Sequence, residues 1–252
     1  MYRVTGVRLV ESFLRTRTEG TLLICHEGFP GAFPVKQPRL RTYSLKRSAL
    51  LNSWLARNRD IIPRRFGGAA RDCDCPVPRD PFSRHRLGCH AYWFNQNACR
   101  WFRKIVSLQY ALRLPAYDTV VWVDADCVFK RPLPESVVAA SFSHNAVYYL
   151  KSGDREVMES GVIGIRTSAE GRKFIAVTVD RYRSGAFRND PRWDDSYQFQ
   201  RTLREHPDIP SIDIATGAIG KKPYGYVLPC SPLAPYLFHQ KGFHARTLKS
   251  LS

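Results

Sequence analysis

Two aspartates that follow an apolar run are the residues of this chain best suited to chemistry. The segment 119–129, TVVWVDADCVF, places Asp124 after five mostly apolar residues and Asp126 two positions later. Where a strand curls into a loop, both carboxylates face the same opening. Carboxylate oxygens suit Mg²⁺ or Mn²⁺, and metals held this way usually bridge substrate phosphates. The alternative is a pair of solvated turn aspartates, but the apolar run favours a strand buried on both faces with a functional pair at its rim.

The elements around this pair indicate one α/β domain spanning residues 1–252. Apolar spacing predicts helices over 4–18, 44–58, 99–114 and 168–185, and a further helix opening at WDDSYQFQRTL. Strands are expected at TLLIC (21–25), TVVWVDADC (119–127) and ESGVIGIR (159–166). This alternation predicts a largely parallel sheet, whose ligands bind beyond the carboxyl ends of its strands. Residues 63–95, rich in Pro, Gly, Arg and Cys, are expected to form a long irregular insert.

The charge balance points to an anionic partner. The formal net charge is +17, spread along the chain without a block of five like charges. Such a field attracts nucleic acid, an acidic membrane surface or phosphorylated ligands, although a soluble surface that is merely basic fits equally well. No apolar run reaches the roughly 18 residues of a membrane span, and the N-terminus lacks the apolar region of a signal peptide. A cytoplasmic protein is therefore expected.

The cysteines indicate free thiols in a reducing compartment. There are seven, an odd number. Four of them, Cys73, Cys75, Cys89 and Cys99, share one segment with two histidines, so a structural zinc is conceivable there. Their C-x-C spacing matches no standard zinc finger, which favours ordinary loop cysteines.

Two enzyme classes place D-x-D after an apolar strand. In haloacid-dehalogenase-like phosphohydrolases the first aspartate is a nucleophile. DADCV fits their pattern, with Asp124 as nucleophile and Asp194–Asp195 as a later metal pair. In the nucleotide-sugar glycosyltransferases of the GT-A type the motif holds the metal on the donor diphosphate. The strand begins at Thr119, far from the N-terminus, and this position favours the second class.

Four segments, in order, resemble the GT-A glycosyltransferases, in particular the galactosyltransferase-like and xylosyltransferase-like families. They are FRKIVSLQYALRLPAYDTVVWVDADCVFKRPL, ESGVIGIR, WDDSYQF and FHQKGFHAR, the last carrying a late His-x-x-Gly motif. The resemblance extends approximately over residues 95–246 and, more loosely, LLICHEGF. It implies a GT-A fold with a mostly parallel, Rossmann-like sheet flanked by helices. GT-A domains start with a strand, whereas here the helix 4–18 precedes the first strand, so the family's first strand is expected to be missing and nucleotide binding to be weakened.

The resemblance also implies roles for individual residues. As metal ligands it implies Asp126 principally, with His239 as the third protein ligand and Asp124 on the metal or the donor ribose. For the donor site it implies Arg103, Lys104, Asp124, Ala125, Lys241, Gly242 and Arg246. For acid–base work on the acceptor it implies Asp195 first, because that acid directly precedes Ser196, and then Asp194 and Glu159. An aspartate at a helix start is also a favoured N-cap, and we expect one of Asp194 and Asp195 to be that cap.

The function implied is sugar transfer from a nucleotide-diphosphate sugar, with UDP favoured, to a hydroxyl acceptor, with Mn²⁺ or Mg²⁺ on the diphosphate. A glycan or glycolipid of the cell envelope would be a suitable acceptor. A basic cytoplasmic enzyme of this kind would work in peripheral contact with the anionic inner face of a membrane. No specific nucleic acid is expected, since no nucleic-acid motif is present. A phosphohydrolase using Asp124, or a catalytically inactive basic binding protein, remains the alternative.

Overall fold

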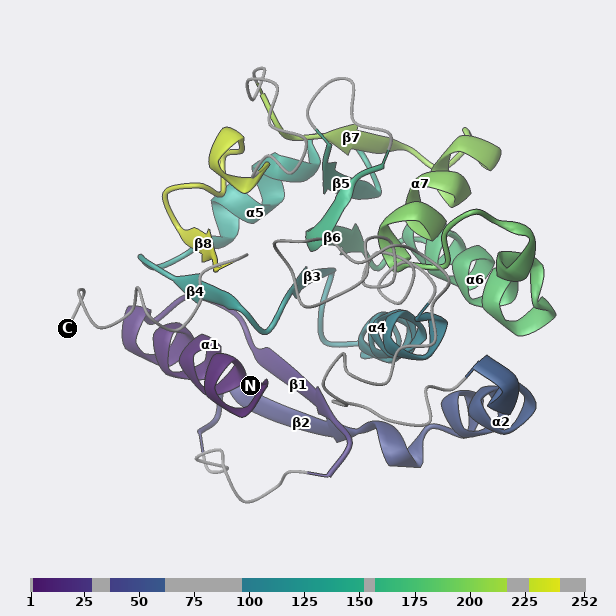
Figure 1. Ribbon diagram of the computed structural model, residues 1–252. Helices are drawn as coiled ribbons and strands as arrows, with labels where there is room; N and C mark the ends of the chain where they lie inside the picture. The colour runs from purple at the N-terminus through teal and green to yellow at the C-terminus, as the bar shows by residue number, and fades with distance from the viewer. Residues whose placement is uncertain (1, 29–36, 62–96, 152–156, 217–226, 241–252) are drawn as a thin grey trace, which may run out of the picture.

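The computed structural model describes residues 2–28, 37–61, 97–151, 157–216 and 227–240, which form a mixed α/β fold (Figure 1). Its α-helices are α1 (Tyr2–Thr16), α2 (Ala49–Arg57), α4 (Ala98–Ala111), α5 (Glu135–Phe142), α6 (Ala169–Ser184) and α7 (Asp195–Glu205). Its strands are β1 (Leu22–His26), β2 (Leu40–Ser44), β3 (Thr119–Val123), β4 (Cys127–Phe129), β5 (Val147–Leu150), β6 (Glu159–Arg166), β7 (Ser211–Asp213) and β8 (Leu237–His239). The expected insert at 63–95, with Cys73, Cys75 and Cys89, lies outside the described residues.

The central sheet is mixed, so the prediction of a largely parallel sheet is wrong for the described strands. Its order is β3-β6-β5-β7. Strand β6 runs antiparallel to both of its neighbours, and β5 and β7 are parallel. Only residues 151–158 separate β5 from β6, fewer than the dozen or so that a crossover between parallel strands needs. The apolar pattern of a strand reports its burial and not its direction, so this orientation is not visible in the strand sequence itself.

Helices cover both faces of the central sheet (Figure 1). Ile163 and Ile165 of β6 belong to one apolar cluster, which they share with buried residues of α2, α4, α6 and α7. Val162, on the opposite face of the strand, belongs to a second cluster shared with α1, α5 and the β4–β8 pair. Alternate residues of a strand point to opposite faces, so β6 is the middle layer between two cores. Seven of its eight residues are buried accordingly.

Strand β3 is less enclosed than its sequence predicts. All five of its residues are half-buried, whereas burial on both faces was expected. The reason is its position at the end of the four-stranded sheet, next to β6 alone among the described strands of that sheet. Strands β1 and β2 form a separate parallel pair, and α1 precedes β1 in the chain. The predicted strand from 159 and the helices beginning near 99, 168 and 195 are confirmed, whereas the strand predicted over 119–127 ends at Val123 and is followed by a turn.

A two-stranded antiparallel ribbon joins the end of β3 to the C-terminal part of the chain. Residue Cys127 of β4 is paired with His239 of β8. Outside the ribbon proper, Lys130 N donates to Tyr236 O at 2.8 Å and Gln240 N donates to Asp126 O at 2.9 Å. Helix α1 packs on the ribbon, with Ser12 Oγ accepting from Phe129 N at 3.0 Å. The pairing therefore fixes where His239 lies relative to the D-x-D turn.

None of the helices in the described part of the chain combines the length and apolar character needed to cross a membrane.

Candidate active site

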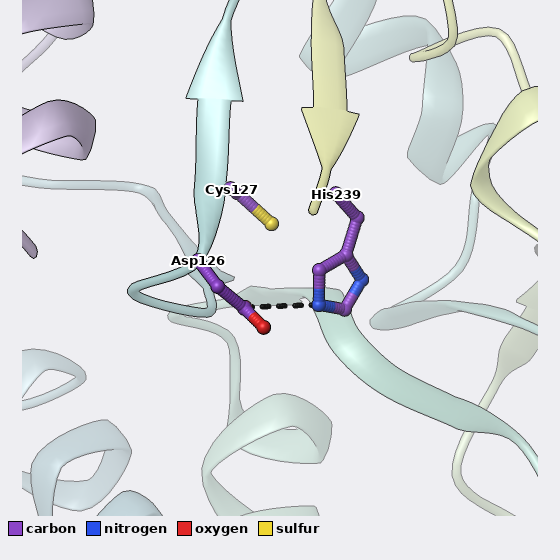
Figure 2. A group of neighbouring side chains, drawn as sticks. All are labelled: Asp126, Cys127 and His239. Atoms are coloured by element: carbon purple, nitrogen blue, oxygen red, sulfur yellow. Dashed lines mark ion pairs between the residues drawn. The ribbon is translucent and has the colours of Figure 1, made fainter. Parts of the chain in front are cut away.

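Asp126 and His239 form the centre of the site. Asp126 lies in the turn between β3 and β4, and His239 ends β8. His239 Nε2 is 2.9 Å from Asp126 Oδ1 (Figure 2). The imidazole is buried, with 1% of its side chain exposed, whereas 40% of the Asp126 side chain is exposed. The pair is thus open to solvent on the Asp126 side and enclosed behind the histidine.

Glu159 holds the histidine from behind. Its Oε1 lies 3.0 Å from His239 Nδ1, and 3% of its side chain is exposed. Its other oxygen, Oε2, accepts a hydrogen bond from Val227 N at 3.3 Å. A carboxylate on Nδ1 favours a proton on that nitrogen, so Nε2, which faces Asp126, is the nitrogen that a metal would use. This carboxylate–histidine arrangement is typical of histidines that bind a metal.

Gly161 lets the histidine approach β6. A Cβ built on Gly161 would lie 2.5 Å from His239 Cε1 and 2.8 Å from its Nδ1. No real side chain tolerates such distances, so only glycine leaves room for the imidazole at this point of the strand. Gly161 O also accepts from Asp124 N at 2.9 Å, which ties the start of the D-x-D turn to the same position.

Lys104 organises the other half of the site. This lysine of α4 is buried, 5% exposed, and its Nζ lies 3.2 Å from Asp124 Oδ1 and 2.7 Å from Asp195 Oδ2. It also donates to Ser160 O at 2.5 Å. Burial alone would lower the pKa of Lys104, but the carboxylates of Asp124 and Asp195 outweigh it and raise the pKa above its ordinary value. One cation therefore links the first aspartate of the D-x-D motif to the start of α7.

The two acids at the start of α7 have different environments. Asp194 is the N-cap: its side chain accepts from Tyr197 N, and Arg192 pairs with both of its oxygens. Burial raises the pKa of Asp194, with Arg192 opposing the shift. Asp195 is the first helical residue, 1% exposed, and it faces Lys104. The expectation that one of the pair caps the helix is confirmed, and the capping residue is Asp194.

The remaining predicted donor residues are scattered. Arg103 donates from Nε to Glu27 Oε2 at 2.8 Å and from Nη1 to Cys99 O. Ala125 is exposed in the turn between Asp124 and Asp126. Lys241, Gly242 and Arg246 lie outside the described residues. The structure therefore brings the predicted residues together in two groups. One group contains Asp124, Lys104 and Asp195. The other contains Asp126, His239 and Glu159.

Two residues of the site were not predicted from the sequence. Trp122 Nε1 donates to Asp124 Oδ1 at 2.6 Å, which fixes that carboxylate from within β3. Cys127, fully buried, lies with Asp126 and His239 in a group whose possible metal-ligand atoms are all within 4.8 Å of one another (Figure 2). The sequence shows that Cys127 directly follows Asp126. It does not show the β4–β8 pairing that turns the thiol toward His239.

Comparison with known proteins gives distant structural similarity. A glycosyltransferase involved in the glycosylation of the major capsid of PBCV-1 aligns with 61% of this chain and 77% of its own, at 16% identity and a TM-score of 0.40. Mouse xyloside xylosyltransferase 1, in its apo form, aligns with 96% of this chain and 92% of its own, at 11% identity and a TM-score of 0.49. No family model and no curated protein sequence matches the chain. At this level of similarity, a function has to be argued from the residues of the site.

Proposed function

We propose that this protein is a metal-dependent glycosyltransferase, which moves a sugar from a nucleotide-diphosphate sugar to a hydroxyl acceptor. One observation carries the proposal: the exposed carboxylate of Asp126 and the buried imidazole of His239 converge at the end of β3, with Glu159 orienting the imidazole. An oxygen and a nitrogen ligand of this kind suit Mn²⁺ and, less well, Mg²⁺. Because 40% of the Asp126 side chain is exposed, its carboxylate is accessible to a diphosphate from solvent.

Some residues of the site would bind the donor, and others would position these binding residues. Asp126 and His239 would bind the metal, which when bound would neutralise the negative charge that develops on the departing nucleoside diphosphate. Asp124, whose Oδ1 is already engaged by Trp122 and Lys104, is assigned to the metal or the donor ribose through its remaining oxygen. Lys241, Gly242 and Arg246 follow His239 closely in the chain and are proposed to contact the phosphates, together with Arg103 and the backbone at Ala125.

The acids near α7 are assigned to the acceptor side. Asp195 is proposed to orient the acceptor hydroxyl or accept its proton, with Lys104 holding the carboxylate in place. Asp194 fixes the start of the helix on which Asp195 lies. Lys104 is buried between two carboxylates, so we assign it to positioning Asp124 and Asp195. Glu159 is bonded to His239, and we assign it to positioning the imidazole.

The partners follow from charge. A net charge of +17 favours an anionic donor such as a UDP-sugar, and it favours peripheral contact with an anionic membrane. A glycan or glycolipid of the cell envelope, met at the cytoplasmic face, is the proposed acceptor class.

The test is release of the nucleoside diphosphate from a panel of UDP-, GDP- and CDP-sugars in the presence of Mn²⁺, with and without glycan acceptors. The wild type should turn over one donor class. His239→Ala should reduce turnover by about 10²–10³-fold, as when one charge-stabilising group is removed. His144→Ala, at an exposed histidine, is the matched control. Phosphate release from a phosphomonoester that depends on Asp124, without turnover of any nucleotide sugar, would replace the proposal with the phosphohydrolase.

A further inference from the structure

Cys127 extends the Asp126–His239 pair into a group of three different ligand types. A carboxylate oxygen, a thiol sulfur and an imidazole nitrogen lie within 4.8 Å of one another. The Cys127 side chain is 0% exposed and takes part in no disulfide. Figure 2 shows the thiol and the imidazole projecting toward each other from β4 and β8, with the Asp126 carboxylate at the edge of the pair.

The backbone imposes this arrangement. Cys127 and His239 are directly opposite in the antiparallel register, so their side chains leave the ribbon on the same face. The hydrogen bond from Gln240 N to Asp126 O continues the pairing at this end of the ribbon. Glu159 engages His239 on its Nδ1 side, which leaves Nε2 for the group that contains Asp126 and Cys127. The backbone pairing of β4 and β8 therefore places the three ligand residues in one group.

We propose that Cys127 is a third protein ligand of the metal, and that the site prefers a borderline metal such as Zn²⁺ or Co²⁺ to Mg²⁺. Zinc accepts Cys, His and Asp ligands together, and catalytic zinc sites combine three protein ligands with one open position. Mg²⁺ takes oxygen ligands and gains nothing from a sulfur. On binding, the Cys127 thiol releases its proton to solvent and the sulfur ligates as thiolate.

The dimensions suit this ion. Bond lengths of about 2.0 Å to nitrogen and oxygen and about 2.3 Å to sulfur place tetrahedral ligand atoms roughly 3.3–3.5 Å apart. Asp126 Oδ1 and His239 Nε2, at 2.9 Å, have to separate slightly, and the widest spacing of the group, at most 4.8 Å, has to contract by up to about 1.3 Å. Asp126 lies in a turn and 40% of its side chain is exposed, so its carboxylate is the ligand best placed to make most of this movement. The inference rests on the proposed function, since the open position is the one that a diphosphate oxygen of the donor would take.

The test uses the full chain in a background where Cys73, Cys75 and Cys89 are changed to Ser, which removes three of the four cysteines that could form a competing metal site in the cysteine-rich segment. Addition of Co²⁺ alone should produce a sulfur-to-cobalt charge-transfer absorption band. Cys127→Ser should abolish the band, and the matched control Cys230→Ser, at a half-buried cysteine, should retain it. Cys127→Ser should also weaken Zn²⁺ binding by at least about 10-fold and leave Mg²⁺ binding unaltered.

A second measurement needs no variant of Cys127. X-ray absorption of the zinc-loaded background protein should show one sulfur neighbour at about 2.3 Å. A spectrum with nitrogen and oxygen neighbours alone, or a cobalt band that survives Cys127→Ser, would overturn the inference. If either of these results came with nucleotide binding that still required metal, the proposed function would stand and Cys127 would not be a ligand. If sulfur ligation were found and no nucleotide bound, the metal site would stand and the proposed function would fail.

Discussion

His239 Nδ1 lies 3.0 Å from Glu159 Oε1, although 80 residues separate the two in the chain and both side chains are buried. A buried carboxylate is costly unless it is bonded, so this contact stabilises Glu159 as well as directing the imidazole. It connects the start of β6 to the end of β8. This contact determines which nitrogen of His239 faces Asp126.

Replacing Glu159 by Gln should weaken metal binding. The amide keeps the shape of the side chain but loses the charge that raises the basicity of the imidazole, and such partners of a ligating histidine contribute about 10–100-fold in metal affinity. Titration with Mn²⁺, followed by its electron paramagnetic resonance signal, measures the change. Glu11→Gln, at an exposed glutamate of α1, is the matched control and should have no effect. Equal affinities in the two variants would show that Glu159 does not act through His239.

Gly161→Ala should displace the histidine. The added methyl group would meet His239 Cε1 at 2.5 Å, so either the ring or β6 has to move. Overpacking of this kind costs about 1–3 kcal/mol. We expect a lower free energy of unfolding in urea and loss of metal binding. Gly6→Ala serves as the control because no atom lies within 4 Å of its added methyl. A variant that retained both stability and metal affinity would be inconsistent with this packing.

Lys104→Met should be strongly destabilising. It leaves Asp124 and Asp195 without the cation that lies between them, and removal of one partner of a buried ion pair costs about 3–5 kcal/mol. Lys173→Met is the natural comparison, since the Lys173–Asp208 pair is exposed and such pairs contribute at most about 1 kcal/mol. Urea unfolding at neutral pH measures both. A cost at Lys104 as small as that at Lys173 would mean that the two aspartates do not depend on the lysine.

Asp194→Asn should change the pH dependence of stability. Burial raises the pKa of Asp194 above its ordinary 3.8, so between 3.8 and the raised value the folded state binds more protons than the unfolded state. The stability that this group contributes is therefore fully present below about pH 3.8 and is lost as the pH rises through the raised pKa. Asparagine remains a good N-cap and does not titrate.

The measurement is the difference in free energy of unfolding between the wild type and Asp194→Asn across the acid range. Relative to the variant, the wild type should lose stability as the pH rises from about 4 and then reach a plateau. A difference that is flat, or that grows with pH, would show that the pKa of Asp194 is not raised.

The sequence predicted the elements that carry the site better than their arrangement. The helix with Lys104, the strands before Asp124 and from Glu159, and the helix at Asp195 all follow from apolar spacing and capping residues. The antiparallel placement of β6 does not, since strand direction depends on the length of the connection that precedes it. The contact between Glu159 and His239 joins two distant segments through tertiary packing alone. Cys127 faces His239 because of the β4–β8 register, for which three-residue strands give no usable signal.

The most direct test of the central claim is nucleotide binding that requires both metal and Asp126. A thermal-shift panel would cover UDP, GDP, CDP and their sugars, each with no metal and with Mn²⁺, Mg²⁺ or Zn²⁺. It would compare the wild type with Asp126→Asn and with Asp180→Asn, an exposed control. A ligand present at 100 times its Kd stabilises the folded state by about 2.7 kcal/mol, which is readily detected. We predict that one nucleotide class stabilises the wild type and Asp180→Asn only when metal is present, and that Asp126→Asn does not respond. No stabilisation by any nucleotide with any of these metals, or stabilisation that persists in Asp126→Asn, would contradict the account.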